Sequence, residues 1–184
     1  MVSADLVERF ADGAVAAGAE VVRAPDLAAA LAAVARLFAE AGVARALATR
    51  PVHAAAAAAG LAVGLPADAG AIAEADAALV AADFGAAETG TLVHLDADDE
   101  EKLAWTLPPL CVSLLERSRI VPDLQSLAGT MADHLARPGI PGPQVSFVTG
   151  PSRTADIENC LTIGVQGPAR LVVVLVGEEE APRR

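Results

Sequence analysis

The stretch Gln144–Val148, continued by TGPSRTADIE over residues 149–158, is the part of the sequence that decides the fold. Its apolar run with β-branched residues is followed by the turn-forming pair Gly150-Pro151 and then by hydroxyl and charged residues at helical spacing. This order predicts a strand, a tight loop and the start of a helix. Open α/β sheets bind ligands in such loops, at the carboxyl ends of their strands.

Arg153 is the residue of this loop best suited to an anion. The dipole at a helix N-terminus favours a carboxylate or phosphate. At that position the planar Arg153 guanidinium would supply several N–H donors to the same anion. The alternative is that Arg153 pairs with Asp156 or Glu158 on the surface. The candidate ligand-binding residues of the loop are Gly150, Ser152, Arg153, Thr154 and Asp156.

The first third of the chain predicts alternating helices and strands. Apolar spacing, propensity and Gly or Pro stop signals place helices at 3–17, 25–41 and 51–59, and strands at 19–23, 43–48 and 61–65. A β-α-β-α-β run is typical of a parallel sheet with helices on both faces.

The remaining elements are shorter. We expect one or two helical turns at 70–75, strands at 78–81, 91–95, 110–115 and 171–176, a loop at 85–90, a solvated acidic turn at 96–102, a helix ending near 136 and a linker at 137–143. With seven or eight strands, the pattern predicts one α/β domain over residues 1–184, a three-layer α/β/α sandwich. Residues 1–18 would hold its N-terminal helix and 177–184 a frayed acidic tail.

Composition restricts the class of protein. A hydrophobic fraction of 54% in 184 residues favours a compact globule, and a net charge of −11 argues against a nucleic-acid partner. The N-terminus has acids and lacks a long apolar core, and the longest mild apolar run, 54–65, is too short to span a membrane. The sequence therefore predicts a cytoplasmic protein without a membrane span.

The residue types present also restrict the chemistry. Cys111 and Cys160 form no CxxC or Cys/His pattern, so we expect neither a metal nor a cluster, and no cofactor, in this chain. Lys102 is the only lysine and stands in an acidic run, which argues against a Schiff base and a Walker A loop.

Four segments together resemble the lactate utilization protein C family, also called the LUD-domain family. They are AETGT at 87–91, TGPSRTADIE at 149–158, GVQGP at 164–168 and RLVVVL at 170–175. The resemblance covers about residues 71–176. It implies a Rossmann-like sheet of the NagB/RpiA/CoA-transferase type and an accessory or ligand-binding role in oxidising L-lactate to pyruvate, with iron–sulfur partner proteins carrying the redox centres.

Glu88 is the catalytic candidate within the AETGT segment. Its carboxylate could act as a general base or bind a ligand hydroxyl, or it could only hydrogen-bond to neighbouring threonines. CoA-transferase relatives use a loop glutamate as a nucleophile, so the alternative is a stand-alone enzyme on a small phosphorylated or CoA-linked substrate, and a non-catalytic scaffold is the third. Candidate ligand-binding residues here are Thr89, Gly90 and Thr91. We expect the Glu88 and Arg153 loops at the same, carboxyl-terminal edge of the sheet.

Two positions depart from the family pattern. Many relatives have His where this chain has Gln166, a further ligand-binding candidate, and a second His where it has Cys111. Neither glutamine nor a thiol buried in an apolar strand replaces a proton-shuttling histidine, so the sequence leaves open whether the chain is an enzyme. The sequence also leaves open whether the chain forms a homo-oligomer. His94, alternating with apolar neighbours, is expected to face solvent. Trp105 is expected to be a partly buried anchor, although beside Pro108-Pro109 it could also line a pocket or an interface.

Overall fold

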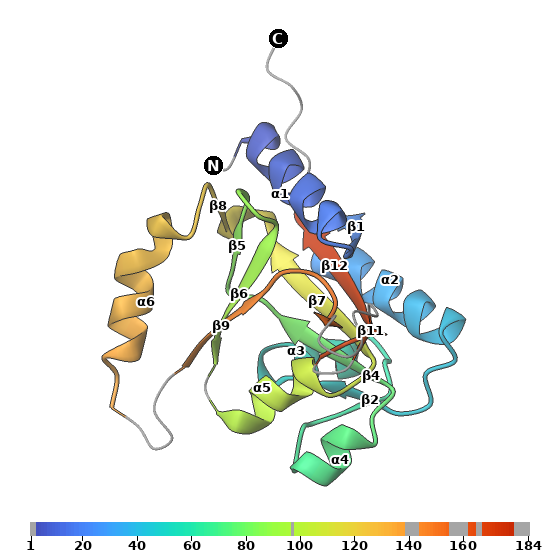
Figure 1. Ribbon diagram of the computed structural model, residues 1–184. Helices are drawn as coiled ribbons and strands as arrows, with labels where there is room; N and C mark the ends of the chain where they lie inside the picture. The colour runs from blue at the N-terminus through green and yellow to red at the C-terminus, as the bar shows by residue number, and fades with distance from the viewer. Residues whose placement is uncertain (1–2, 97, 139–143, 155–161, 165–166, 179–184) are drawn as a thin grey trace.

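A six-stranded, wholly parallel sheet is the centre of the fold (Figure 1). The protein is represented by a computed structural model, which describes residues 3–96, 98–138, 144–154, 162–164 and 167–178. The strands lie in the order β1-β12-β7-β4-β2-β3. They are β1 Glu20–Ala24, β2 Ala46–Ala48, β3 Val63–Gly64, β4 Ala77–Ala81, β7 Leu110–Glu116 and β12 Arg170–Val176.

Both faces of this sheet are buried. Along β12, Val172 and Val174 join the core on one side, while Val173 and Leu175 join the core on the other. This explains why residues 171–175 form an unbroken apolar run and do not alternate with polar residues. Two helices, α2 Leu27–Glu40 and α3 Arg50–Ala58, cover the first side.

The other side is covered by a mixed layer. It contains the helices α1 Ala4–Ala16 and α5 Asp99–Thr106 and a second sheet in the order β8-β5-β6-β9. Phe10 and Leu92 of this layer pack in one core cluster with Leu115 and Val173 of the parallel sheet. The strands of the second sheet are β5 Phe84–Ala86, β6 Thr91–Asp96, β8 Ile120–Val121 and β9 Gln144–Val148. The predicted three-layer α/β/α fold is thus confirmed, although the strands expected at 91–95 and 144–148 lie outside the central sheet.

Small elements complete the chain. They are α4 Ala69–Ala73, the 3-10 turns η1 Arg117–Arg119 and η2 Gln125–Leu127, α6 Ala128–Leu135 beside β9, and the short antiparallel pair β10 Arg153–Thr154 and β11 Thr162–Ile163. No helix within the described residues is both long and apolar enough to cross a membrane.

Two local predictions were wrong, and a third falls mostly outside the described residues. The loop expected at 85–90 begins with β5, which pairs with β6 as a hairpin. The acidic turn expected at 96–102 is the start of α5, because Asp98 Oδ1 accepts a hydrogen bond of 2.9 Å from the Glu101 amide and so caps a helix. Arg153–Thr154, expected at the start of a helix, pair with β11, and the residues that would continue this helix, 155–161, lie outside the described part.

The chain reverses its winding between β2 and β4. From β2 it moves outward through α3 to the edge strand β3, whereas from β4 it crosses the other face to reach β7. Neighbouring loops therefore leave in opposite directions, which opens a crevice at the carboxyl ends of these two strands.

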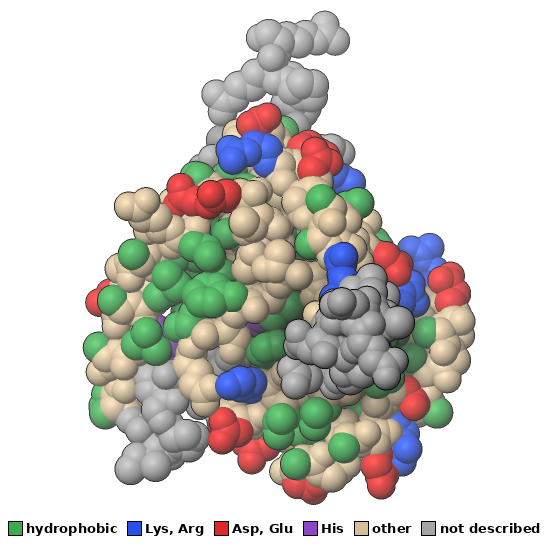
Figure 2. All heavy atoms as spheres, in the orientation of Figure 1, with side chains coloured by type: hydrophobic (Ala, Val, Ile, Leu, Met, Phe, Trp, Pro, Cys, Tyr) green, Lys and Arg blue, Asp and Glu red, His purple; other side chains and the backbone are tan. Residues whose placement is uncertain are grey.

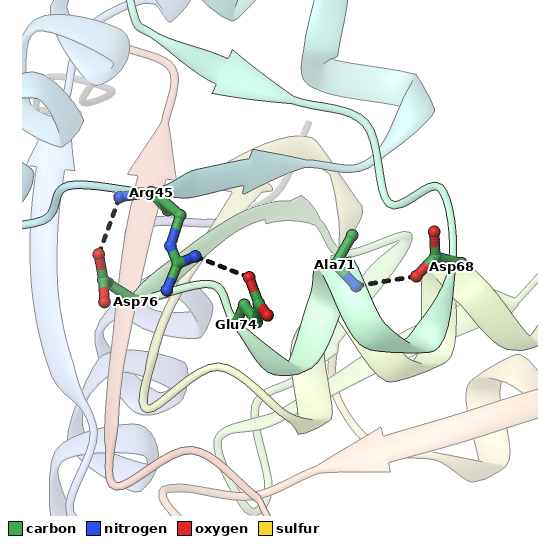
Figure 3. Close-up of polar contacts among 5 residues, drawn as sticks. All are labelled: Arg45, Asp68, Ala71, Glu74 and Asp76. Atoms are coloured by element: carbon green, nitrogen blue, oxygen red, sulfur yellow. Dashed lines mark hydrogen bonds and ion pairs between the residues drawn. The ribbon is translucent and has the colours of Figure 1, made fainter.

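The opposite, amino ends of β2 and β4 are tied together by charged residues (Figure 3). Asp76 Oδ2 accepts hydrogen bonds from the Ala44 and Arg45 amides at 2.9 and 2.8 Å, and the Arg45 side chain pairs with Glu74 at 2.7 Å. The hydrogen bonds that the Arg45 and Ala44 amides donate to the Asp76 carboxylate lower the pKa of Asp76. Asp68 caps α4 by accepting from the Ala71 amide at 2.8 Å. The contacts of Asp76 with Ala44 and Arg45 join β2 and β4 at the ends opposite to the crevice.

Candidate functional site

Three threonines join the two loops that the sequence singled out. Thr89 Oγ1 lies 2.6 Å from Thr91 Oγ1, which lies 2.7 Å from Thr149 Oγ1. Thr91 is buried, so its hydroxyl depends on these partners. The structure therefore brings the AETGT segment and the start of the Arg153 loop together, and gives Thr89 and Thr91 a role in fastening them.

We expect Thr91→Val to lower the free energy of unfolding by about 1 kcal/mol, because it removes two partly buried hydrogen bonds while the exposed Thr89 and Thr149 hydroxyls can turn to water. Urea unfolding measures the effect. Thr130→Val, at an exposed position of α6, is the control and should change stability by less than about 0.5 kcal/mol. Equal stability of the two variants would show that the threonine chain contributes nothing.

Both loops are seated on the C-terminal half of α1. Gly90 packs against the backbone of Gly13 and Ala14, and Gly150 packs against the backbone of Ala17. The absence of a side chain at Gly90 and Gly150 is thus explained by close packing against a helix.

Arg153 lies at the amino edge of the parallel sheet. The neighbouring Ser152 donates its amide to the carbonyl of Pro168 at 2.9 Å, two residues before β12 begins, and the Arg153 guanidinium lies against Gly18, two residues before β1 begins. The predicted carboxyl-edge position of this loop is therefore wrong. The reason is that the quoted strand, β9, belongs to the second sheet, so its end does not mark the carboxyl edge of the parallel one.

A groove of about 480 Å³ accompanies this loop, and we call it the Arg153 groove. Its lining includes Trp105, Phe147, Gly150, Ser152, Arg153 and Gly167. Phe147 is 49% exposed, and Figure 2 shows hydrophobic side chains gathered over the second sheet on this face. Arg153 is exposed there and lies in the short strand β10, which pairs with β11.

The other predicted residues receive less support. Glu88 is exposed, its amide donates to the Pro122 carbonyl at 3.0 Å, and no described side chain hydrogen-bonds or ion-pairs with its carboxylate. Asp156 and Gln166 lie outside the described residues, and only the backbone of Thr154 is described. Cys111 is buried, and burial raises the pKa of its thiol to about 12, as expected for an inert core cysteine.

A cavity that the sequence did not indicate lies at the carboxyl ends of β2 and β4, where the winding reverses. It has a volume of about 510 Å³, and we call it the carboxyl-edge crevice. It is lined by Thr49, Arg50, Pro51, Val80, Ala81, Asp83, His94, Leu95, Glu101 and Trp105. Trp105 lines the Arg153 groove as well and so lies between the two cavities.

His94 is the central polar residue of this crevice. It is 5% exposed, and its ring stacks on Trp105 with centroids 5.5 Å apart and an interplanar angle of 15°. Burial lowers the pKa of His94 to about 4, against opposing contributions from the nearby Asp83 carboxylate and from a hydrogen bond to the Ala81 carbonyl. The ring is therefore neutral at physiological pH. Asp83 Oδ2 in turn accepts from the Leu95 amide at 2.8 Å.

The expectation that His94 faces solvent was wrong. His94 lies on the same face of β6 as Leu92, which is fully buried against the parallel sheet, and α5 brings Trp105 over the ring. Side chains two residues apart in a strand lie on the same face, so a buried Leu92 indicates that His94 faces inward as well. The sequence could have shown this only if the helix capped by Asp98, which carries Trp105, had been identified.

Thr49 and Arg50 stand on the β2 side of the crevice. Thr49 is 6% exposed at the N-cap of α3 but makes no side-chain cap, and no described group hydrogen-bonds to its hydroxyl. Arg50 pairs through Nη1 with Asp98 and, at 3.5 Å, with Glu101, which ties α3 to α5. Among the described residues, no three His, Cys, Asp or Glu side chains are grouped as metal ligands.

Comparison with known proteins gives the family context. The sequence model of the LUD domain family matches residues 7–176. The chain is similar to lactate utilization protein C of Anoxybacillus flavithermus, with 36% identity over 94 residues, which are 51% of this chain and 40% of that protein. It is similar to the Bacillus subtilis protein of the same name, with 32% identity over 93 residues, 50% of this chain and 38% of that one. The matches thus cover less than half the length of these relatives.

The fold has a solved counterpart. A crystal structure of a DUF162 family protein from Deinococcus radiodurans matches with a TM-score of 0.73, covering 96% of this chain and 100% of that one. The two sequences are 19% identical, so this match establishes the fold alone.

Proposed function

The chain belongs to the LUD domain family, and on this premise we propose that it is a ligand-binding subunit of a cytoplasmic L-lactate utilization system. The ligand-binding part of the proposal rests on one observation: the carboxyl-edge crevice lies where the winding of the parallel sheet reverses, the usual ligand position in open α/β sheets. The lactate context is supported by relatives named lactate utilization protein C.

Iron–sulfur partner proteins are part of the same proposal. An iron–sulfur cluster is commonly held by four cysteine thiolates. This chain has two cysteines, and one of them, Cys111 of β7, is buried in the hydrophobic core. We therefore propose that the redox centres that convert lactate to pyruvate lie in partner proteins, and that this chain binds a small carboxylate beside them.

A gene deletion tests the proposed function. A strain that lacks the gene should grow normally on glucose and poorly on L-lactate, and a plasmid copy should restore growth on lactate. Affinity purification of the tagged chain from lactate-grown cells should also recover proteins with the visible absorbance of iron–sulfur clusters. Unchanged growth on L-lactate, together with purification of the chain alone, would refute the proposal.

A further inference from the structure

We infer that the carboxyl-edge crevice binds an α-hydroxy carboxylate with an apolar tail, with its acid group at Thr49 and Arg50 and its hydroxyl group at His94. The inference rests on the proposed ligand-binding function and adds the chemical class of the ligand and the residues that recognise it. It concerns the crevice and not the Arg153 groove, on which the sequence reasoning had placed the site.

The β2 side of the crevice offers hydrogen-bond donors for an acid group. Thr49 places a hydroxyl there without a described partner, although the side chain is more than nine-tenths buried. The ion pairs of Arg50 use Nη1, which leaves its Nε and Nη2 donors without described partners. The Arg50 amide is also one of the free N–H groups in the first turn of α3, a nine-residue helix. A carboxylate would satisfy these donors and favour the positive end of the helix dipole.

The β4 side offers an acceptor. The neutral His94 ring carries its one proton on one of its two nitrogens. The second ring nitrogen therefore has a free lone pair, and no described side chain donates to it. A hydroxyl group can donate to this nitrogen, whereas a keto group cannot. A buried acceptor left unpaired is costly, so the crevice should prefer a hydroxy acid to the corresponding keto acid.

The other residues that line the crevice are the reason for expecting an apolar tail on the ligand. Apolar side chains, Pro51, Val80, Ala81, Leu95 and Trp105, form much of the wall. A volume of about 510 Å³ is in the range of sites for ligands much larger than lactate. Affinity should therefore rise when the methyl group of lactate is replaced by a larger apolar group.

The sole tryptophan makes the experiment direct. Because Trp105 lines the crevice and the chain has no tyrosine, intrinsic fluorescence reports on this region. The probes are lactate, mandelate, phenylglyoxylate as the keto counterpart of mandelate, and phenylacetate, which lacks the hydroxyl; calorimetry measures the same dissociation constants. We expect mandelate to bind more tightly than lactate, and at least about tenfold more tightly than phenylglyoxylate or phenylacetate.

Three variants locate the bound acid. Thr49→Val keeps the shape and removes the hydroxyl, so it should weaken mandelate binding about tenfold. His94→Phe keeps a flat ring on Trp105 and removes the acceptor, so it should bring mandelate and phenylacetate to the same affinity. Arg153→Ala, in the other cavity, is the control and should leave mandelate binding unchanged. Circular dichroism and urea unfolding check that each variant folds, and if His94→Phe does not fold, the preference of the unmodified protein among the probes decides.

Several outcomes would overturn the inference. Equal binding of mandelate and phenylacetate to the unmodified protein would show that His94 does not recognise the hydroxyl. Loss of binding in Arg153→Ala with retention in Thr49→Val would place the ligand in the Arg153 groove, which contradicts the inference and leaves the proposed function intact. If none of the four acids binds, the inference is wrong, and the growth test on L-lactate still judges the proposed function separately.

Discussion

Gly90→Ala should lower the free energy of unfolding by about 3–5 kcal/mol, a large fraction of the stability of an ordinary domain. Gly90 has φ +66°, where a β-carbon costs about 1–2 kcal/mol. A β-carbon there would also overlap the backbone of Gly13 and Ala14 in α1, which cannot move without displacing the helix. The hairpin that carries His94 would then separate from α1. Urea unfolding at neutral pH measures the loss.

Gly42→Ala separates the two causes. Gly42 has the same φ of +66°, at the end of α2, but nothing lies within 4 Å of an added β-carbon. This control should lose only the conformational part, about 1–2 kcal/mol. If both variants lose the same amount, the close approach of the AETGT segment to α1 contributes no stability, and Gly90 has no packing role against that helix.

The fold was predictable from the sequence where a segment's local pattern determines its structure. The helices predicted at 3–17 and 25–41 and the strand predicted at 171–176 were confirmed, at 4–16, 27–40 and 170–176, because apolar period, caps and stop signals agree there. The resemblance to the LUD-domain family was confirmed as well. By contrast, β6 and β9 were recognised as strands but not assigned to a second sheet, because strand pairing depends on contacts distant in sequence.

The site was less predictable for the same reason. The contact of Thr91 with Thr149 joins residues far apart in the chain, and the pattern of either loop alone does not indicate it. The crevice combines Thr49 after β2, His94 of β6 and Trp105 of α5, so it becomes visible only when the strand order is known. The predicted Arg153 position failed because the carboxyl end of a strand indicates a ligand site only in the parallel sheet.

The second large effect is a loss of stability in acid that depends on His94. Burial lowers the pKa of His94 from its ordinary value of 6.5 to about 4. Between these values the unfolded chain binds a proton that the folded protein does not, so stability falls as the pH falls through this window and is unaffected by His94 above it. The shift corresponds to about 3 kcal/mol in full, of which about 2–3 kcal/mol should be lost between about pH 7 and about pH 4.5.

His94→Gln isolates this contribution, because glutamine does not titrate and keeps a polar side chain of similar reach. The groups that face His94 in the crevice, Asp83, Glu101 and Arg50, are retained in the variant. Whatever His94→Gln costs at neutral pH, its stability should therefore fall less steeply on acidification than that of the unmodified protein. Parallel curves would mean that the folded protein protonates His94 as readily as the unfolded chain does. A protonated ring has no free lone pair, so in that case the hydroxyl acceptor of the crevice would be lost below about pH 6.5 instead of below about pH 4.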